Sequence, residues 1–344
     1  MLATVLHHPA PATGGPLDLA RVADPEPGPG ELLVRVSACA VCRTDLQLCE
    51  GDLPARRLPI IPGHQVVGVV EALGPAVAGT TGAGVAGPGG AAPAVGTRVG
   101  LTWLAGTCGH CRFCVRGDEN LCEAARFTGW DRDGGYAELV VARAGFAHRL
   151  PDGPADADLA PLLCGGVIGW RALKVCGVQP GQRLGLFGFG ASASIVIQVA
   201  VHRGCEVYVC TRSERERVLA IELGATWAGD FAERPPELLD AAITTAPVGD
   251  AIVHALAALD RGGVVAVNAI HLDRVPEFSY DLLWWERQVR SVANVTRADA
   301  REFLAAAAEI PVVTRHEQRP LDEAGEALVD LAAGRVEGSV VLIP

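Results

Sequence analysis

Four cysteines stand close together in the segment CGHCRFCVRGDENLC. They are Cys108, Cys111, Cys114 and Cys122. Four thiolates at this spacing can close a tetrahedron around one zinc ion, and four protein ligands leave that ion no open position. The competing interpretations are an iron–sulfur cluster and a set of cysteines without a metal, which would be prone to oxidation. We predict a structural zinc site in this segment.

A second candidate set is dispersed along the chain: Cys42 in CRTD, His64 in PGHQVVG and Cys164 in LLCGG. Two thiolates and one imidazole would leave a zinc ion a fourth position for an alcohol or carbonyl oxygen. The separations alone do not establish such a site. Each cysteine could be a small core residue, and the histidine could be a hydrogen-bonded turn residue.

The segment GFGASA, residues 188–193, stands between a predicted strand and a predicted helix. A dinucleotide pyrophosphate binds at such a helix N-terminus, and Ala193 takes the place of the third glycine, where only a small residue is needed. The stretch 184–201 carries no charge and is almost long enough to cross a bilayer. Its glycines and polar residues instead favour a strand, a turn and a helix.

The choice of cofactor depends on the end of the second predicted strand, where an NAD site normally has an acidic residue. Here that strand ends in Cys210-Thr211-Arg212-Ser213. Thr211, Arg212 and Ser213 could receive a 2′-phosphate, with the Arg212 guanidinium supplying charge. Ser213 could instead be a helix N-cap that forms a capping box with Glu216. We favour NADP(H) over NAD(H) because the acid is missing.

Composition limits the class of protein. A chain of 344 residues predicts two domains, and 49% hydrophobic with 20% charged residues is typical of a soluble globular protein. The net charge of −11 argues against a nucleic-acid partner. The first residues lack a charged leader before an apolar core, so we expect a cytoplasmic location. Eleven cysteines there indicate metal binding or catalysis rather than disulfides.

The pattern of apolar residues changes along the chain. Short runs such as LLVRVSA, VVGVVEAL and YAELVVA predict a mainly β region over 34–150. From about residue 181 strands and helices alternate, which predicts parallel βαβ units; within them AIVHALAALDRGG is expected as one helix closed by glycines. The tail is predicted to form helices and a last strand. Residues 74–97, rich in Gly, Ala and Pro, predict a flexible loop insertion.

In combination and in this order, the three motifs resemble the zinc-containing medium-chain dehydrogenase/reductase family, which includes the zinc-dependent alcohol dehydrogenases. The resemblance covers nearly all 344 residues. It implies an α/β protein with a GroES-like, β-rich catalytic domain and a Rossmann-type, doubly wound parallel sheet. We expect the catalytic domain with its zinc lobe at 1–150, the cofactor-binding domain at 151–295, and a return to the catalytic domain at 296–344.

The resemblance also implies roles for single residues and two zinc ions per chain. Cys42, His64 and Cys164 match the ligands of the catalytic zinc, and the four clustered cysteines match the structural site. Thr44 matches the hydroxyl that hydrogen-bonds the substrate oxygen and passes its proton toward solvent. Asp45 matches a carboxylate behind the zinc ligands. The residues implied to bind the cofactor are Arg43, Gly188, Phe189, Gly190, Ala191, Ser192, Thr211, Arg212, Ser213 and Arg297.

The chain departs from the family at two polar positions. Gln47 stands where a histidine is common at the outer end of the proton relay, and Gln65 stands where a glutamate is common beside the zinc-bound histidine. Glutamine cannot titrate near neutral pH, so we expect slower proton transfer or a path through water, and altered ligand exchange at zinc. Trp103 resembles a tryptophan of the substrate pocket, and Trp130 is a further candidate for that pocket.

Three functions remain open at this point. The leading one is a zinc-dependent alcohol dehydrogenase or aldehyde reductase that transfers hydride between NADP(H) and a primary or secondary alcohol or its carbonyl product. The alternative is a zinc-containing reductase of an activated C=C or C=N bond, because the relay histidine is absent. A more distant one is a zinc- and dinucleotide-binding protein without turnover. The expected partners are a small-molecule alcohol or aldehyde and further copies of this chain, as a dimer or tetramer, with no membrane.

Overall fold

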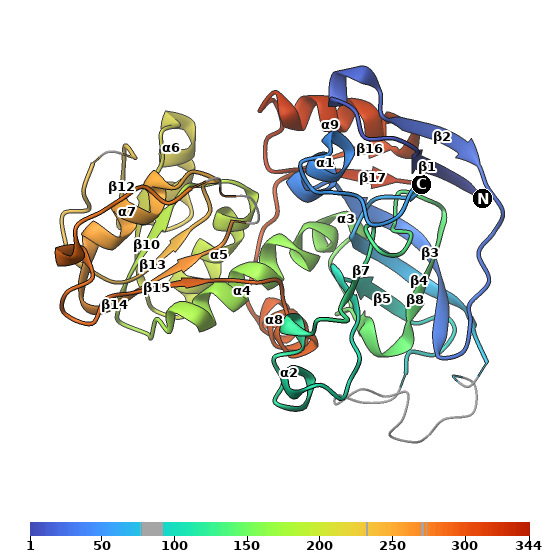
Figure 1. The fold of residues 1–344 in the computed structure, drawn as a ribbon, viewed down its shortest axis with the longest axis horizontal. Helices are drawn as coiled ribbons and strands as arrows, with labels where there is room; N and C mark the ends of the chain where they lie inside the picture. The colour runs from blue at the N-terminus through green and yellow to red at the C-terminus, as the bar shows by residue number, and fades with distance from the viewer. Residues whose placement is uncertain (76, 78–91, 232, 270–271, 273) are drawn as a thin grey trace. The chain divides into compact units, whose positions relative to one another are not determined.

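Strand β3 is the centre of the larger sheet in the computed structural model, which describes all residues except 76, 78–91, 232, 270–271 and 273. Leu32, Val34 and Val36 alternate along β3 as buried residues, so one face of the strand packs into the core. The sheet order is β16-β17-β3-β4-β5-β9, with β8 also paired to β3 (Figure 1). Its strands are β3 (Glu31–Ala40), β4 (Gln65–Leu73), β5 (Arg98–Leu101), β8 (Leu139–Arg143), β9 (Ala147–Arg149), β16 (His316–Pro320) and β17 (Ser339–Ile343).

This sheet belongs to the first of two compact units, made of Met1–Cys164, Val295–Ala305 and Thr314–Pro344. The unit also contains a small sheet of β1 (Leu2–Leu6) and β2 (Leu17–Arg21) and a lobe of short elements. The lobe contains β6 (Leu104–Gly106), α2 (Arg112–Val115), η2 (Glu119–Leu121) and β7 (Arg126–Phe127). The remaining elements are η1 (Ala12–Gly14), α1 (Arg43–Glu50), η3 (Ala144–Phe146), α3 (Asp156–Leu159), η4 (Ala160–Leu163), α8 (Arg297–Glu309), which begins in this unit, η6 (Leu321–Glu323) and α9 (Ala324–Ala332).

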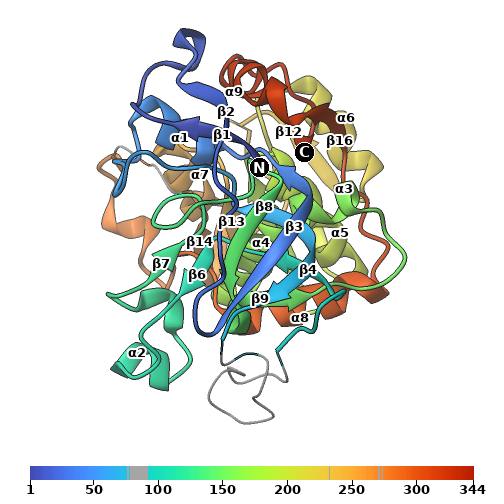
Figure 2. The ribbon, with the colours of Figure 1, turned by 90° about the vertical axis from the view of Figure 1, so that its right-hand side faces the viewer.

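The chain returns to this unit at its end. Strand β17 pairs antiparallel with β3, with Val341 opposite Ala40 and Leu342 opposite Cys39. Both termini therefore lie in the same unit, as Figure 2 shows. Residues 151–164 also pack here, although the sequence prediction assigned them to the cofactor-binding domain. Most of the predicted insertion at 74–97 lies outside the described residues.

The second unit, Gly165–Asn294 with Ala306–Val313, contains a six-stranded sheet in which every pairing is parallel. Its order is β12-β11-β10-β13-β14-β15. The strands are β10 (Arg183–Phe187), β11 (Glu206–Cys210), β12 (Trp227–Gly229), β13 (Leu239–Thr244), β14 (Leu259–Val267) and β15 (Gln288–Ser291). The order reverses between β10 and β13, which is where doubly wound sheets bind ligands at the carboxyl ends of their strands. The predicted Rossmann-type sheet is confirmed.

Helices cover the strands of this sheet (Figure 1). They are α4 (Gly165–Cys176), α5 (Ala191–His202), α6 (Glu214–Glu222) and α7 (Asp250–Ala258), with η5 (Tyr280–Leu282) after the fifth strand. Alternate residues of β10 divide between two faces: Phe187 joins the cluster that contains Ile252 and Leu256 of α7, whereas Leu184 and Leu186 lie outside that cluster. Both faces of β10 are therefore buried, as expected for a central strand of a parallel sheet.

The predicted end of one helix is wrong. The helix expected over AIVHALAALDRGG ends at Ala258, and β14 begins at Leu259. Leu259 is fully buried and stands opposite Leu239 of β13. Pairing with the neighbouring strand thus decides the conformation of a segment whose apolar residues continued the helical pattern.

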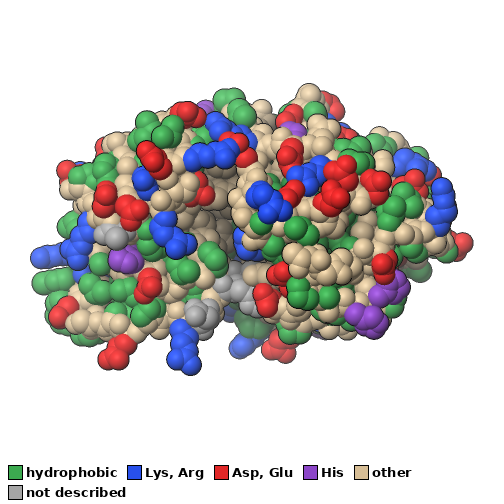
Figure 3. Space-filling view, turned by 90° about the horizontal axis from the view of Figure 1, so that it is seen from above, with side chains coloured by type: hydrophobic (Ala, Val, Ile, Leu, Met, Phe, Trp, Pro, Cys, Tyr) green, Lys and Arg blue, Asp and Glu red, His purple; other side chains and the backbone are tan. Residues whose placement is uncertain are grey.

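No single helix among the described residues is long and apolar enough to cross a membrane. Residues 156–163 and α4, joined through a bend of 40°, pass the same test of length and composition together, as buried helices also do. On the face shown in Figure 3, basic side chains are mixed with acidic ones.

Candidate active site and metal centre

Helix α1 begins directly after Cys42, and Asp45 in its first turn reaches back to that residue. The Oδ2 atom of Asp45 accepts the backbone N–H of Cys42 at 2.9 Å. This hydrogen bond satisfies a donor at the start of the helix. It also fixes Cys42 at the helix N-terminus, where the backbone dipoles stabilise a thiolate.

The same buried carboxylate holds His64. Asp45 Oδ1 lies 3.0 Å from Nδ1 of His64 and accepts the backbone N–H of Gly63 at 3.3 Å. A carboxylate at Nδ1 favours the tautomer that carries its proton there, which leaves Nε2 available to a metal ion. The segment CRTD and the PGH turn are therefore joined by one side chain.

Cys164 completes the set, immediately after η4. The ligand atoms of Cys42, His64 and Cys164 all lie within 4.8 Å of one another. The fold thus brings together three residues that are far apart in the sequence, all within the first unit. Two sulfurs and one ring nitrogen at this separation could hold one zinc ion and leave a fourth position open.

The site favours a charged sulfur. Hydrogen bonding with Cys164 lowers the pKa of Cys42 well below its usual range, and His64 adds to this effect. The same contact and burial raise the pKa of Cys164. Burial opposes protonation of His64, but the Asp45 carboxylate outweighs it and raises the pKa of His64 to about 10. One thiolate forms readily, and a bound cation would displace the remaining protons.

The four clustered cysteines also converge. The sulfurs of Cys108, Cys111, Cys114 and Cys122 all lie within 4.8 Å of one another. Cys111 Sγ is 3.5 Å from that of Cys114, and Cys122 Sγ is 3.6 Å from that of Cys108. The backbone N–H of Cys111 donates to Cys108 Sγ at 3.3 Å. Four sulfurs so close together fit a closed tetrahedral zinc site.

The glycine turn stands between β10 and α5. Gly188 has a φ of +93°, and a Cβ there would lie 2.7 Å from the backbone nitrogen of Ala246, so only glycine fits. Gly190 is the N-cap of α5. Phe189 and Ala193 are buried, and the Ser192 hydroxyl donates to the carbonyl of Gly165 at 2.9 Å. Backbone N–H groups, rather than these side chains, are what the turn could offer a pyrophosphate.

Comparison with known proteins agrees with this geometry. The family model of the alcohol dehydrogenase GroES-like domain matches residues 28–152, and that of the zinc-binding dehydrogenase matches 193–309. A Mycobacterium tuberculosis (strain CDC 1551 / Oshkosh) protein named "Probable alcohol dehydrogenase AdhA" is 51% identical over 344 residues, which are 100% of this chain and 97% of that protein. An alcohol dehydrogenase of Geobacillus stearothermophilus is 33% identical over 95% of this chain and 96% of its own.

The chain belongs to the zinc-dependent medium-chain dehydrogenase/reductase family. It is an oxidoreductase of the alcohol dehydrogenase type.

Solved structures show the same fold. A cinnamyl alcohol dehydrogenase, SbCAD4 from Sorghum bicolor, superposes on this dehydrogenase with a TM-score of 0.86 at 25% sequence identity. The match covers 99% of this chain and 97% of the other.

The polar residues that follow Cys42 and His64 in the sequence of this dehydrogenase differ in burial and in hydrogen bonding. The Thr44 hydroxyl lies 3.7 Å from Cys42 Sγ, whereas Arg43 is exposed. The buried Gln65 donates to the carbonyl of Ala40 at 3.2 Å, across the β3–β4 pairing. Gln47 is only 8% exposed, and its Oε1 has no hydrogen-bond partner among the described residues. Gln47 is thus a buried amide rather than a group at the surface.

An aromatic cluster stands beside His64. The Trp103 ring centroid lies 6.1 Å from that of His64, and Trp130 stacks on Trp103 at 5.7 Å. Phe127 lies 4.7 Å from Trp103, and the Arg56 guanidinium lies 3.7 Å from the Trp130 ring centre. Trp103 therefore lies near a candidate ligand, and Trp130 packs on Trp103. Phe127 and Arg56 were not predicted, because only the fold brings them to the tryptophans.

Arg297 forms an ion pair with Glu119 within the first unit. Its Nη2 lies 2.7 Å from Glu119 in the cysteine lobe, its Nε lies 3.0 Å from the same carboxylate, and its guanidinium lies over the Phe146 ring. The side chain of Arg297 is only 12% exposed and that of Glu119 only 9%. The resemblance implied a cofactor contact for Arg297, which stays a prediction; the contacts that the structure describes are those of an ion pair within the first unit.

The side chains at the end of β11 are bonded to the first turn of α6. Ser213 caps α6 by accepting the backbone N–H of Glu216 at 3.3 Å, as expected for an N-cap. The Glu216 carboxylate, however, accepts the hydroxyl of Thr211 at the strand end. Arg217 donates to the carbonyls of Thr211 and Arg212 at 2.9 and 3.1 Å, and Arg212 itself is exposed. The carboxylate of Glu216, from the next helix, therefore lies at the end of a strand that has no acid of its own.

Proposed function

We propose that the chain is a zinc-dependent alcohol dehydrogenase or aldehyde reductase that transfers hydride between NADP(H) and a primary or secondary alcohol or its carbonyl product. The observation that carries this proposal is the convergence of Cys42, His64 and Cys164 within 4.8 Å. A zinc ion held there would supply a Lewis acid for the substrate oxygen, with the nicotinamide as hydride donor or acceptor. The cysteine lobe would hold a second, structural zinc ion.

The chain's own residues would position the substrate and its proton. Thr44, beside Cys42, is the hydroxyl that would hydrogen-bond the substrate oxygen and relay its proton. Asp45 would keep His64 oriented, and Trp103 and Trp130 would form an apolar wall that excludes water. Because Gln47 cannot titrate near neutral pH, the proton would leave through water.

A reductase of an activated C=C or C=N bond is the second candidate. The buried, untitratable Gln47 favours it, since such a reaction need not protonate a carbonyl oxygen. A protein that binds zinc and dinucleotide without turnover is less well supported, because Thr44 lies beside the three convergent ligands.

Metal analysis joined to a substrate panel tests the proposal. We expect two zinc ions per purified chain and NADPH oxidation with aldehydes or ketones that a chelator abolishes. Consumption of NADPH with enals or cyclic imines, but not with aldehydes, would favour the second candidate. One zinc ion per chain would contradict the proposed catalytic site.

NADP(H) is the proposed cofactor because Arg212 is exposed at the carboxyl end of β11, where it can meet a 2′-phosphate. Glu216 acts in the opposite sense, since a carboxylate hydrogen-bonded to Thr211 repels that phosphate. Glu216→Gln keeps an oxygen acceptor for Thr211 and removes the charge. We expect roughly a fivefold rise in NADPH affinity relative to NADH, from the ~1 kcal/mol typical of exposed charge pairs. Fluorescence titration of both cofactors measures it.

Glu214→Gln is the matched control for that prediction, because Glu214 is exposed in the same first turn of α6. It should change the affinity ratio little. An unchanged ratio in Glu216→Gln, or an equal change in both variants, would show that Glu216 does not influence cofactor choice.

We also propose a homo-oligomer in the cytoplasm, a dimer or tetramer. Strand β15 is the edge of its sheet and all four of its residues are exposed, with Tyr280, Trp284 and Trp285 exposed just before it in the chain. Unpaired edge strands and exposed aromatic groups favour association. Sedimentation velocity tests this: a monomer at micromolar concentration would refute it.

A further inference from the structure

We propose that Tyr136 is a positioning residue of the candidate catalytic site, whose hydroxyl fixes the carboxylate that orients His64. The inference rests on the proposed function, because it concerns the zinc site of Cys42, His64 and Cys164. Tyr136 is fully buried, and its hydroxyl donates to Asp45 Oδ2 at 3.2 Å. It comes from the segment before β8, far from the site in the sequence.

The hydrogen bonds of Asp45 show why one hydroxyl matters. Oδ1 accepts from Gly63 and faces His64, while Oδ2 accepts from Cys42 and Tyr136. Each oxygen has two partners, so its lone pairs are fully used. The partners come from three segments: the start of α1, the turn before β4 and Tyr136. Without the Tyr136 hydroxyl, Oδ2 keeps only the contact within its own helix turn, and the plane of the carboxylate is less firmly set.

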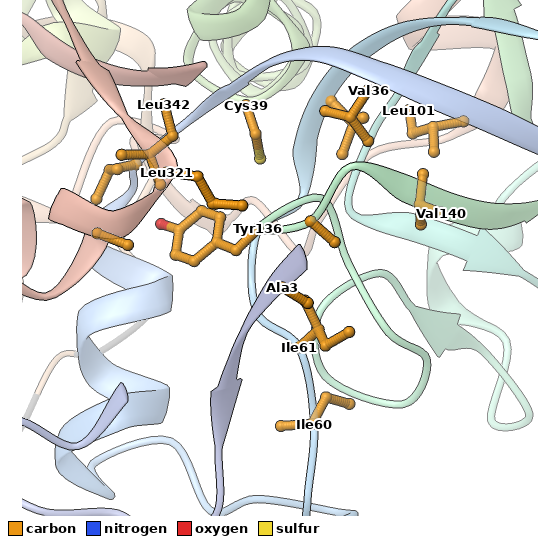
Figure 4. Close-up of a cluster of buried hydrophobic side chains, with 14 of the residues drawn as sticks. Ala3, Val36, Cys39, Ile60, Ile61, Leu101, Tyr136, Val140, Leu321 and Leu342 are labelled. Atoms are coloured by element: carbon orange, nitrogen blue, oxygen red, sulfur yellow. The ribbon is translucent and has the colours of Figure 1, made fainter. Parts of the chain in front are cut away.

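The Tyr136 ring packs tightly against the turn that contains Gly63. A Cβ on Gly63, whose φ is +94°, would lie 2.7 Å from Tyr136 Cε1 and 2.9 Å from Cys39 Sγ. The backbone of Tyr136 is bonded on both sides, with its N–H donating to Pro62 at 3.0 Å and its carbonyl accepting from Thr4 at 2.8 Å. Figure 4 shows the ring beside Leu321 and Leu342 in the core. The core therefore holds the hydroxyl at Asp45.

The hydroxyl keeps its proton throughout the working pH range. Burial raises the pKa of Tyr136 well above its usual range, and the neighbouring Asp45 raises it further. It therefore donates to a carboxylate, and a hydrogen bond with a charged partner is about twice as strong as a neutral one.

Tyr136→Phe tests the proposal because it removes the hydroxyl and keeps the ring. Groups behind metal ligands change metal affinity by roughly 10- to 100-fold, and Tyr136 acts one residue further out, so we expect about tenfold weaker zinc binding at this site. The measurement is zinc release from the holoenzyme to a chelator, with the zinc of the cysteine lobe as internal reference. The absorption spectrum of a Co²⁺-substituted catalytic site should also shift.

The control is Tyr208→Phe in the second unit, which removes a hydroxyl that donates to Glu206 at 3.3 Å. It should leave both zinc sites unchanged. Equal zinc release and identical Co²⁺ spectra in Tyr136→Phe and wild type would overturn the inference while the proposed function stands. Parallel loss of both zinc ions in Tyr136→Phe would also overturn it, since that marks general unfolding. A wild-type protein without zinc at this site would overturn the proposed function as well.

Discussion

Asp45→Asn should lower turnover by roughly 10- to 100-fold and release zinc from the site of Cys42, His64 and Cys164, while the cysteine lobe keeps its ion. Asp45 is 2% exposed and faces four donors. An asparagine offers one acceptor oxygen, and its NH₂ group would point at hydrogen-bond donors. Buried donors would lose their partner at a cost of about 1–3 kcal/mol each, so His64 would lose its orientation.

Zinc per chain and steady-state turnover measure this result together. Asp299→Asn is the control, because Asp299 is also a buried acid of the first unit and accepts the backbone N–H and hydroxyl of Thr296. Its loss should reduce stability without emptying the catalytic zinc site selectively. Two zinc ions and wild-type turnover in Asp45→Asn would show that the carboxylate does not position His64.

The cysteine lobe could be predicted from the sequence because its four residues lie within one short segment, where spacing limits geometry directly. Cys42, His64 and Cys164 are different. Their separations left a core interpretation open for each cysteine and a turn interpretation open for the histidine, and only the resemblance to a family joined them before the structure did. The short apolar run LLVRVSA predicted a strand where β3 lies, and the glycine turn predicted the strand and helix that are β10 and α5, since both signals are local in the sequence.

Contacts between distant segments could not be predicted in this way. Tyr136 meets Asp45 across 91 positions, and Glu119 meets Arg297 across 178. Neither pair has a local pattern, because a side chain's partner depends on how strands and loops pack. Glu216 illustrates the same limit at short range: a capping box predicted where its backbone lies, but its carboxylate bonds to Thr211 instead.

Glu119→Ala should lower the unfolding temperature of the first unit by about 6 to 12 °C. The change leaves the Arg297 guanidinium, 12% exposed, without its carboxylate partner. Breaking a buried ion pair by removing one member costs about 3 kcal/mol or more, and each kcal/mol corresponds to roughly 2–4 °C in a unit of this size. Because Glu119 lies between Cys114 and Cys122, the lobe should also release its zinc to a chelator faster than wild type does.

Two comparisons separate this role from the cofactor contact that the family resemblance implied for Arg297. Arg315 and Glu337 form an exposed ion pair, with side chains 46% and 47% exposed. Glu337→Ala removes one member of this pair and should lower the free energy of unfolding by less than about 1 kcal/mol. Arg297→Met joined to Glu119→Leu replaces the whole pair by apolar groups and should recover most of the lost stability, as buried pairs elsewhere do. If Arg297 served the cofactor, the double variant would instead show weaker NADPH binding, and Glu119→Ala would leave the unfolding temperature unchanged. The bidentate geometry and burial of the pair lead us to expect the stability effect, with cofactor affinity preserved.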